Sequence, residues 1–287
     1  MNTIHPRFRP VKSTHWLLRM IIPFVVAGLF LPNLWLPAIL GLGRVFASVP
    51  VVLSRSMPAQ MMGELHIVHI PFFTGSEGMT SILTLNNNMT EMATATVTLY
   101  NMKGQPLVLP TVRLAPQLPV RFDLSQLANQ PDFESGNVQI AFNGMSMGIT
   151  SQVSVISTAR RVAFESVEDE AMDFTSSRLD GILWLPDSDT QARLALTNTT
   201  ASPVTATVSL AGDGEQRKVI LGPHETQLVE ANGFIESARG PSASGVLVSI
   251  QHDASPGSVM VTGFAVNDET GFSTNFPFVD RTTLVST

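Results

Sequence analysis

The chain has 287 residues, of which 44% are hydrophobic and 14% are charged, and it contains no cysteine. This composition excludes an intrinsically disordered chain, a disulfide-bonded scaffold and a metal site with thiolate ligands. The formal net charge is −6 at pH 7. Because an acidic chain does not attract the phosphate backbone, we exclude nucleic-acid partners.

Residues 1–47 have the composition of an export signal. They contain five of the chain's 17 lysines and arginines and no carboxylate, and residues 20–42 are uncharged. A basic stretch followed by an apolar run is typical of a secretory signal peptide, and residues 45–47 (Val-Phe-Ala) offer a cleavage site. The run is also long enough to cross a bilayer as a helix. A cleaved signal peptide and a retained membrane anchor both stay open, and in either case we expect the rest of the chain to be exported.

Residues 64–168 are predicted to form the first of two antiparallel β-sandwich domains. Residues 93–99 alternate apolar side chains with threonine, and residues 138–142 and 147–156 show the same period of two. The pattern is typical of strands with one buried and one exposed face, so we expect Val97 to be buried and Thr96 to be exposed. Short strands of this kind, repeated over about 110 residues, are typical of a sandwich of immunoglobulin-like size.

Helix is expected at only two places, residues 124–129 and 234–238, each for about one turn. Elsewhere in the body, turn residues such as Asn, Gly, Asp and Pro separate the predicted strands. The chain after the leader is therefore predicted to be all-β.

Two motifs of the first domain resemble metal-binding or catalytic patterns. His66 and His69 are spaced H-x-x-H, but in a strand this spacing places the side chains on opposite faces, so we expect no metal site. Residues 144–148 read Gly-Met-Ser-Met-Gly and match the G-x-S-x-G elbow of serine hydrolases, which requires a strand-to-helix turn. Strands are predicted on both sides of the motif. We therefore expect Ser146 to lie in a hairpin loop and not to be a nucleophile.

Residues 169–180 are predicted to be an acidic linker between the two domains. Six carboxylates lie between positions 165 and 180, and they suit either a calcium ion held between the domains or a solvated connector. The ligand spacing of a calcium-binding loop is absent, which favours the connector. Just before this segment, Arg160 and Arg161 are the candidates for a basic cleft near the junction.

Residues 181–287 are predicted to form a second sandwich domain that repeats the first. Residues 82–99 match residues 193–210 without a gap at a shift of 111. The match places Val208 at the position of a buried valine and Thr207 at that of an exposed threonine. A slip of one residue would invert every face of the strand, so we expect the two copies to superpose strand for strand.

Two later matches extend this duplication along the chain. We align residues 138–142 with residues 246–250, and Phe164 with Phe276. A repeat of about 110 residues is a whole domain rather than one unit of a solenoid.

The second domain also carries candidates for sugar chemistry. Asp187 and Asp189 lie near Trp184, and paired carboxylates beside an aromatic ring suit glycoside hydrolysis, although a turn is the favoured interpretation. Asn88 and Asn198 each begin an N-x-[ST] sequon, but both precede a threonine-rich strand, where asparagine serves the backbone of a turn.

The repeated pattern consists of an L-x-L-x-N segment before a turn, a T-A-T-V-x-L strand, a turn with glycine and a late S-G-x-V-x-I strand. With it, most of residues 70–280 resemble the uncharacterised tandem β-sandwich domains of exported bacterial proteins. Most such domains have no assigned activity. The resemblance therefore implies an architecture and a location and assigns no site residue.

The sequence as a whole predicts an exported, non-enzymatic protein that acts as a surface or periplasmic binding or structural module. The alternatives are a carbohydrate-binding module and, further off, a secreted hydrolase using Asp187 and Asp189 or a periplasmic chaperone using the cleft at Arg160 and Arg161. We expect no cofactor, no metal and no catalytic residue. The expected partner is a protein or a glycan at the cell surface, and we expect membrane contact only through the N-terminal segment.

Overall fold

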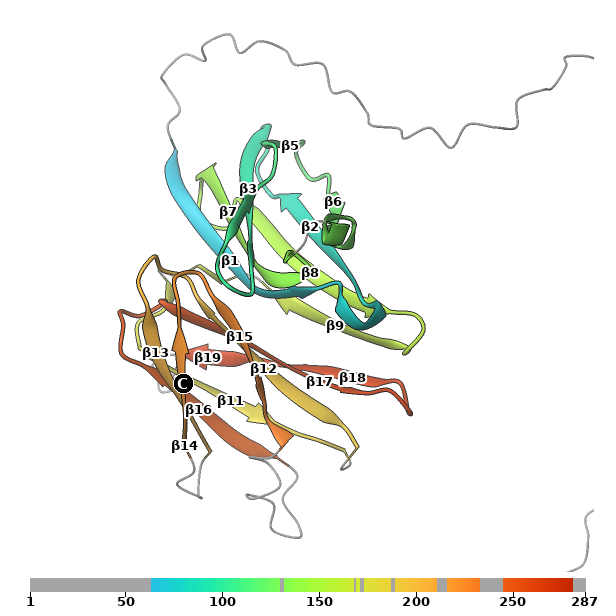
Figure 1. Ribbon diagram of the computed structural model, residues 1–287. Helices are drawn as coiled ribbons and strands as arrows, with labels where there is room; N and C mark the ends of the chain where they lie inside the picture. The colour runs from blue at the N-terminus through green and yellow to red at the C-terminus, as the bar shows by residue number, and fades with distance from the viewer. Residues whose placement is uncertain are drawn as a thin grey trace, which may run out of the picture. The chain divides into compact units, whose positions relative to one another are not determined.

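The computed structural model describes residues 63–129, 132–167, 169–170, 173–186, 189–210, 216–232 and 245–280 (Figure 1). The leader, residues 1–47, and the second predicted helix, residues 234–238, lie outside these residues. The first predicted helix is present as a 3-10 helix, η2 (Leu124–Asn129), and a second 3-10 helix, η1 (Ser76–Gly78), follows the first strand. Among the residues that the structure describes, no helix has the length and apolar character needed to traverse a lipid bilayer.

The first half of the described chain forms two antiparallel sheets, A and B. Sheet A has the order β10-β1-β7-β3-β4, with β5 also paired to β3. Its strands are β1 (Glu64–Thr74), β3 (Ala93–Asn101), β4 (Pro106–Val108), β5 (Val112–Leu114), β7 (Ser135–Gly144) and β10 (Asp169–Glu170). Sheet B has the order β6-β2-β8-β9, with β2 (Thr80–Asn87), β6 (Val120–Asp123), β8 (Ile149–Ser157) and β9 (Val162–Val167).

The second half forms sheets C and D, which repeat the strand order of sheets A and B. Sheet C has the order β14-β13-β16-β11-β19, with β11 (Arg178–Leu183), β13 (Val204–Leu210), β14 (Gln216–Leu221), β16 (Val246–His252) and β19 (Phe278–Asp280). Sheet D has the order β15-β12-β17-β18, with β12 (Gln191–Asn198), β15 (Thr226–Glu230), β17 (Val259–Asn267) and β18 (Phe272–Phe276).

The period of two in the threonine-rich strands has the predicted consequence for burial. Val97 of β3 and Val208 of β13 are both buried, and each belongs to the hydrophobic cluster of its own half. Thr96 is exposed, whereas Thr207 is half-buried. The apolar side chains of these strands therefore face the cores, as the alternation requires.

The predicted alignment of the later strands is wrong by two residues. Ile140 of β7 lies opposite Val97 in sheet A, and Ile250 of β16 lies opposite Val208 in sheet C. Ile250 is therefore the counterpart of Ile140, in place of the predicted Val248. The alternation repeats every two residues, so a shift of two leaves the pattern unchanged and the sequence does not detect it.

The same displacement affects the end of each half. In sheet B, Phe164 of β9 lies opposite Val155, and the corresponding position of sheet D is occupied by Thr274 of β18. Thr274 is therefore the counterpart of Phe164, and the predicted match to Phe276 is wrong.

The predicted all-β class is confirmed, but the four antiparallel sheets are arranged like a four-bladed β-propeller rather than as two separate sandwiches. The physical reason lies in sheet D, whose strands β12 and β17 are buried almost throughout. One face of sheet D contributes to the second hydrophobic cluster, whereas Ala195, Phe264 and Val266 belong to the first. A sheet that is apolar on both faces needs a packed layer on each side, so the two halves share a core.

Candidate functional site

The junction between the two halves is held by a stack of three phenylalanines. Phe264 of β17 stacks on Phe164 of β9 at 4.2 Å between ring centroids and on Phe72 of β1 at 5.4 Å, and Phe72 and Phe164 are themselves 6.4 Å apart. All three side chains are buried. Beside the stack, the hydroxyl of Thr197 donates a 2.6 Å hydrogen bond to the carbonyl of Pro71. Aromatic burial and a satisfied buried hydroxyl together make this a packed interface rather than a loose contact.

A second part of the junction is polar and lies against sheet A. The amide of Asn137 donates to the carbonyl of His224 at 2.9 Å and to the hydroxyl of Thr226 at 3.0 Å. The ring of Tyr100 stacks on that of His224 at 4.4 Å between centroids. Gly104, at a φ of +77°, leaves no room for a side chain, because a Cβ there would lie 1.9 Å from the carbonyl oxygen of Pro223. The turn of residues 222–225 therefore seats directly on the first half.

This polar contact contains histidines that burial keeps neutral. Burial, with a smaller electrostatic contribution from His224, lowers the pKa of His69 from 6.5 to about 4. Burial also lowers the pKa of His224 and raises the pKa of the Tyr100 hydroxyl. The imidazoles are therefore uncharged near neutral pH, because burial disfavours their charged form.

The edge of sheet B and the edge of sheet D run side by side at the same junction (Figure 1). The backbone N–H of Ala163 on β9 donates to the hydroxyl of Ser273 on β18 at 3.0 Å. The N–H of Glu165 donates to the side-chain oxygen of Asn275 at 3.1 Å, and the amide of Asn275 donates in turn to the carbonyl of Glu165. Side chains of β18 thus satisfy backbone groups of β9 that would otherwise form an open sheet edge.

A groove follows these two strands in two sections. The first, of about 540 Å³, combines Ser154, Glu165, Ser273, Thr274 and Asn275 with an apolar floor that includes Ile156 and Phe164. The second, of about 330 Å³, is more apolar and is lined by residues that include Val167, Phe276, Pro277, Phe278 and Val279. Glu165 and Asn275 line both sections. Both halves of the chain therefore contribute to one surface, which we call the junction groove.

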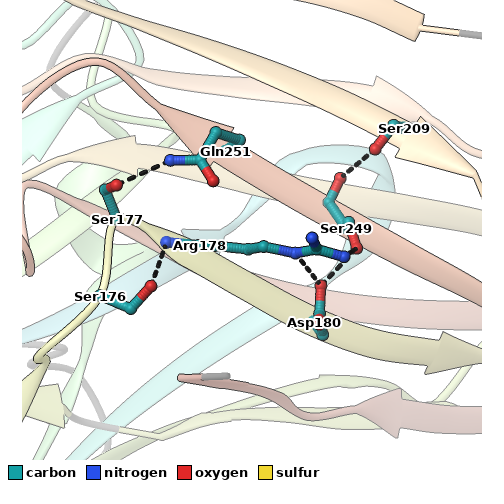
Figure 2. A network of polar contacts seen from close by, with 7 residues as sticks. All are labelled: Ser176, Ser177, Arg178, Asp180, Ser209, Ser249 and Gln251. Carbon is teal, nitrogen blue, oxygen red and sulfur yellow. Dashed lines mark hydrogen bonds and ion pairs between the residues drawn. The ribbon is translucent and has the colours of Figure 1, made fainter. Parts of the chain in front are cut away.

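A polar network on sheet C explains the end of the predicted acidic linker (Figure 2). The guanidinium of Arg178 contacts the carboxylate of Asp180 at 3.0 Å and donates to the hydroxyl of Ser249 at 2.7 Å, and that hydroxyl donates to the same carboxylate. Asp180 is buried. A buried carboxylate is tolerated when it is paired and hydrogen-bonded, and Arg178 and Ser249 supply both contacts to Asp180.

The acidic segment therefore differs from the predicted solvated connector at both ends. Asp169 and Glu170 form β10, which pairs with β1, and Arg178 begins β11. Glu168 lies outside the described residues. Within the part of the chain that the structure describes, no group of three or more histidine, cysteine, aspartate or glutamate side chains is placed to hold a metal ion.

The two predicted histidines lie on opposite faces of β1, as the spacing indicates. His66 stacks on Phe142 inside the first half at 5.4 Å between centroids. His69 faces the junction, where the electrostatic interaction with His224 contributes to lowering its pKa. The motif around Ser146 forms the turn between β7 and β8. A strand follows the serine, so the strand-to-helix geometry of a nucleophile elbow is not formed there.

The predicted basic cleft does not form at Arg160, because this side chain makes a two-point ion pair with Asp268, with both contacts at 2.7 Å. Arg161 lies in the same turn with a φ of +56°. Of the predicted carboxylate pair, Asp187 lies outside the described residues, and Asp189 is exposed. Trp184 is exposed and contacts Phe272 edge-on at 6.1 Å.

The two sequons differ in accessibility. Asn198 is fully buried, and its side chain bonds the backbone of Ser202, Gly222 and Thr200 at 2.7, 2.8 and 2.9 Å. It therefore serves the turn, as the sequence indicates. Asn88 is exposed, and its amide donates to the carbonyl of Met147 at 3.0 Å.

No sequence motif marks the residues of the junction groove. Ser273 and Asn275 belong to no motif, and their role depends on the meeting of two strands separated by 110 residues. One signal was available: Leu194, Ala195 and Leu196 form an unbroken apolar run where the first half alternates. Such a run indicates a strand that is buried on both faces.

Comparison with models of known protein families and with curated protein sequences finds no match for this chain.

Proposed function

We propose that the chain is a non-enzymatic, exported binding protein and that the junction groove is its ligand-binding surface. One observation carries the proposal: both halves supply hydrogen-bonding side chains to the same groove. Ligand sites lie preferentially where two structural units meet and combine an apolar lining with a few polar groups that fix orientation.

The lining favours a glycan as the ligand. Hydroxyl groups of Ser154 and Thr274 lie beside apolar surface from Ile156, and Glu165 adds a carboxylate. A sugar presents the same combination, because hydroxyl groups at its rim alternate with C–H surfaces. Uncharged donors and acceptors fit a sugar better than they fit an ionic ligand, because an ionic ligand would require a cluster of side chains of opposite charge. A protein at the cell surface is the alternative partner.

The absence of an enzymatic role is part of this proposal. Titratable groups that the sequence singled out make structural contacts: Arg160 pairs with Asp268, and Asp180 is held by Arg178 and Ser249. We also propose that the two halves descend from one duplicated unit, a view supported by the identical strand orders of sheets A and C and of sheets B and D.

The proposed location rests on the leader. Residues 1–47 combine five cations, no acid and a long uncharged run, which is typical of export. The N-terminal sequence of the protein isolated from its own cells tests this part. A start at Ser48 indicates a cleaved signal, and Met1 in the membrane fraction indicates an anchor. Full-length protein found soluble in the cytoplasm would contradict both.

A glycan array probed with the full-length chain in mild detergent tests the ligand class. Ile156→Trp is designed to fill the groove, and Ile182→Trp, on the exposed outer face of sheet C, is the matched control. We expect wild type and the control to retain the same glycans and the groove variant to lose them. Equal binding by Ile156→Trp would contradict the groove, and a wild type that retains no glycan would contradict the ligand class.

A further inference from the structure

Four methionines gather at one end of the first half, on two neighbouring turns. Met89 and Met92 lie in the turn between β2 and β3, and Met145 and Met147 lie in the turn between β7 and β8. The turns are joined by Asn88, whose N–H donates to the carbonyl of Gly148 at 2.9 Å and whose side chain donates to the carbonyl of Met147 at 3.0 Å. The four thioethers therefore share one connected piece of structure.

Three of these side chains face solvent, and the fourth lies beneath them. Met92, Met145 and Met147 are 61%, 66% and 71% exposed. Met89 is half-buried, and its sulfur lies over the backbone of Gly144 and Gly148: a Cβ at these glycines would be 2.9 and 3.1 Å from that sulfur. The glycines thus leave room for the sulfur of Met89 at the base of the turn that carries Met145 and Met147.

The second half contains the same pair of turns without the methionines. The N–H of Thr199 donates to the carbonyl of Ser258 at 3.0 Å, in the manner of Asn88 and Gly148. Thr200 and Pro203 stand at the positions of Met89 and Met92. The fold of these turns therefore does not require thioethers, and their presence in the first half needs another reason.

The backbone conformation of Met147 also indicates that the turn does not require a methionine. Its φ is +58°, in the left-handed region that favours glycine, and its counterpart in the second half is Gly257 at +76°. Local backbone energetics select glycine at such a position, and a methionine there is disfavoured. Met147 is therefore not the residue that the backbone conformation of this turn favours.

We propose that Met89, Met92, Met145 and Met147 form a binding site for Cu(I). Thioether sulfur is a soft, uncharged donor, and soft donors select Cu(I) over the hard cations that prefer carboxylate and carbonyl oxygen. Large exposed apolar side chains also suit a protein contact, but such a contact does not depend on sulfur. The site is separate from the junction groove and does not rest on the function proposed for it.

Competition with bicinchoninate, which forms a coloured Cu(I) complex, measures the affinity under anaerobic conditions. The full-length chain in mild detergent is titrated with Cu(I) supplied as its acetonitrile complex. Met145→Leu/Met147→Leu removes two sulfurs and keeps the apolar volume. Met102→Leu, a half-buried methionine in the turn between β3 and β4, is the matched control.

We expect wild type and Met102→Leu to take one Cu(I) from the chelator with equal affinity. The double variant is expected to bind at least about tenfold more weakly, because even outer-shell changes lower metal affinity by about 10–100-fold. A wild type that takes no Cu(I), or a double variant with wild-type affinity, would overturn the proposal.

A spectroscopic measurement on wild type keeps the proposal testable if the double variant does not fold. The copper K-edge absorption spectrum of the Cu(I)-loaded chain is expected to show sulfur scatterers in the first shell. A shell of nitrogen and oxygen alone would overturn the site. Oxidation of the exposed thioethers to sulfoxides by dilute hydrogen peroxide is expected to abolish Cu(I) binding in wild type, and unchanged binding after oxidation would also overturn it.

Discussion

Replacement of Phe264 by alanine tests whether the two halves fold as one cooperative unit. Phe264 is buried and stacks on Phe164 and Phe72 of the other half at 4.2 and 5.4 Å between ring centroids. Truncation of a buried phenylalanine to alanine lowers the free energy of unfolding by about 3–5 kcal/mol. Each aromatic pair contributes about 0.5–1.5 kcal/mol of stabilisation, so two lost pairs place Phe264→Ala in the upper part of that range.

Denaturant unfolding monitored by circular dichroism measures the loss, and amide hydrogen exchange locates it. A shared core predicts a single transition at a lower midpoint, with the same dependence on denaturant concentration. Exchange is expected to increase in β1 and β9 as well as in β17, because all three strands contribute a ring to the stack.

Phe272→Ala is the matched control. Phe272 also belongs to the second half, but it is only partly buried and packs against the second cluster, away from the stack. We expect a smaller loss and unchanged exchange in the first half. If Phe264→Ala increases exchange in sheets C and D alone and leaves β1 and β9 protected as in wild type, the inference of a shared core is wrong.

Three further predictions concern pH, the turns and the serine. As the pH falls below 6.5, the unfolded chain takes up a proton at His69 before the folded chain does, so the free energy of unfolding is expected to fall by about 3 kcal/mol between pH 6.5 and 4. Most of this slope is expected to be absent in His69→Gln. Urea unfolding at three pH values measures the slope, and an equal slope in the variant would contradict the assignment. Asn198→Ala removes three short hydrogen bonds to the backbone, worth about 0.5–1.5 kcal/mol each, together with one from the hydroxyl of Thr200. The same assay is expected to show a loss of about 2–4 kcal/mol, and a loss below about 0.5 kcal/mol would show that water replaces these bonds. A fluorophosphonate probe is expected to label neither wild type nor Ser146→Ala, and labelling of wild type alone would identify Ser146 as a nucleophile.

Much of the strand pattern could be predicted because burial imposes a period of two. The alternation around Val97 and Val208 identified the buried face of each strand without any knowledge of the partners. The same periodicity hid the displacement of the later strands, since Ile140 matches Val248 and Ile250 equally well by pattern. Cross-strand pairing decides between them, and it depends on three-dimensional packing.

The relation between the halves could not be predicted from motifs, because no local segment of the chain encodes it. In the first half, Thr84 and Ser154 keep the outer face of sheet B partly polar. Their counterparts in sheet D are Ala195 and Phe264, which lie in the first cluster. The break in alternation in sheet D was visible in the sequence. It indicates that both faces of the strand are buried, but it does not show which part of the chain packs on the second face.

The acidic segment shows a different limit. Counting carboxylates between the domains suggested a solvated connector, whereas Asp180 lies in a sheet with its charge paired to Arg178. The two residues are separated by two positions, and in a strand that spacing puts both side chains on one face. Net charge describes how a segment behaves on average, while the environment of one carboxylate depends on its nearest cation.

The two halves differ at the junction groove and at the methionine turns. The strand order is the same in both, and the buried asparagines Asn87 and Asn198 hold equivalent turns. Where the first half has Ser154, the second has Phe264, and this side chain joins the hydrophobic cluster of the first half. The thioether cluster that includes Met147 is the converse case, since there the first half departs from what the backbone favours while the second keeps glycine. The shared strand order requires neither Phe264 nor Met147, so the proposed glycan and the proposed Cu(I) ion would occupy surfaces in which the two halves differ.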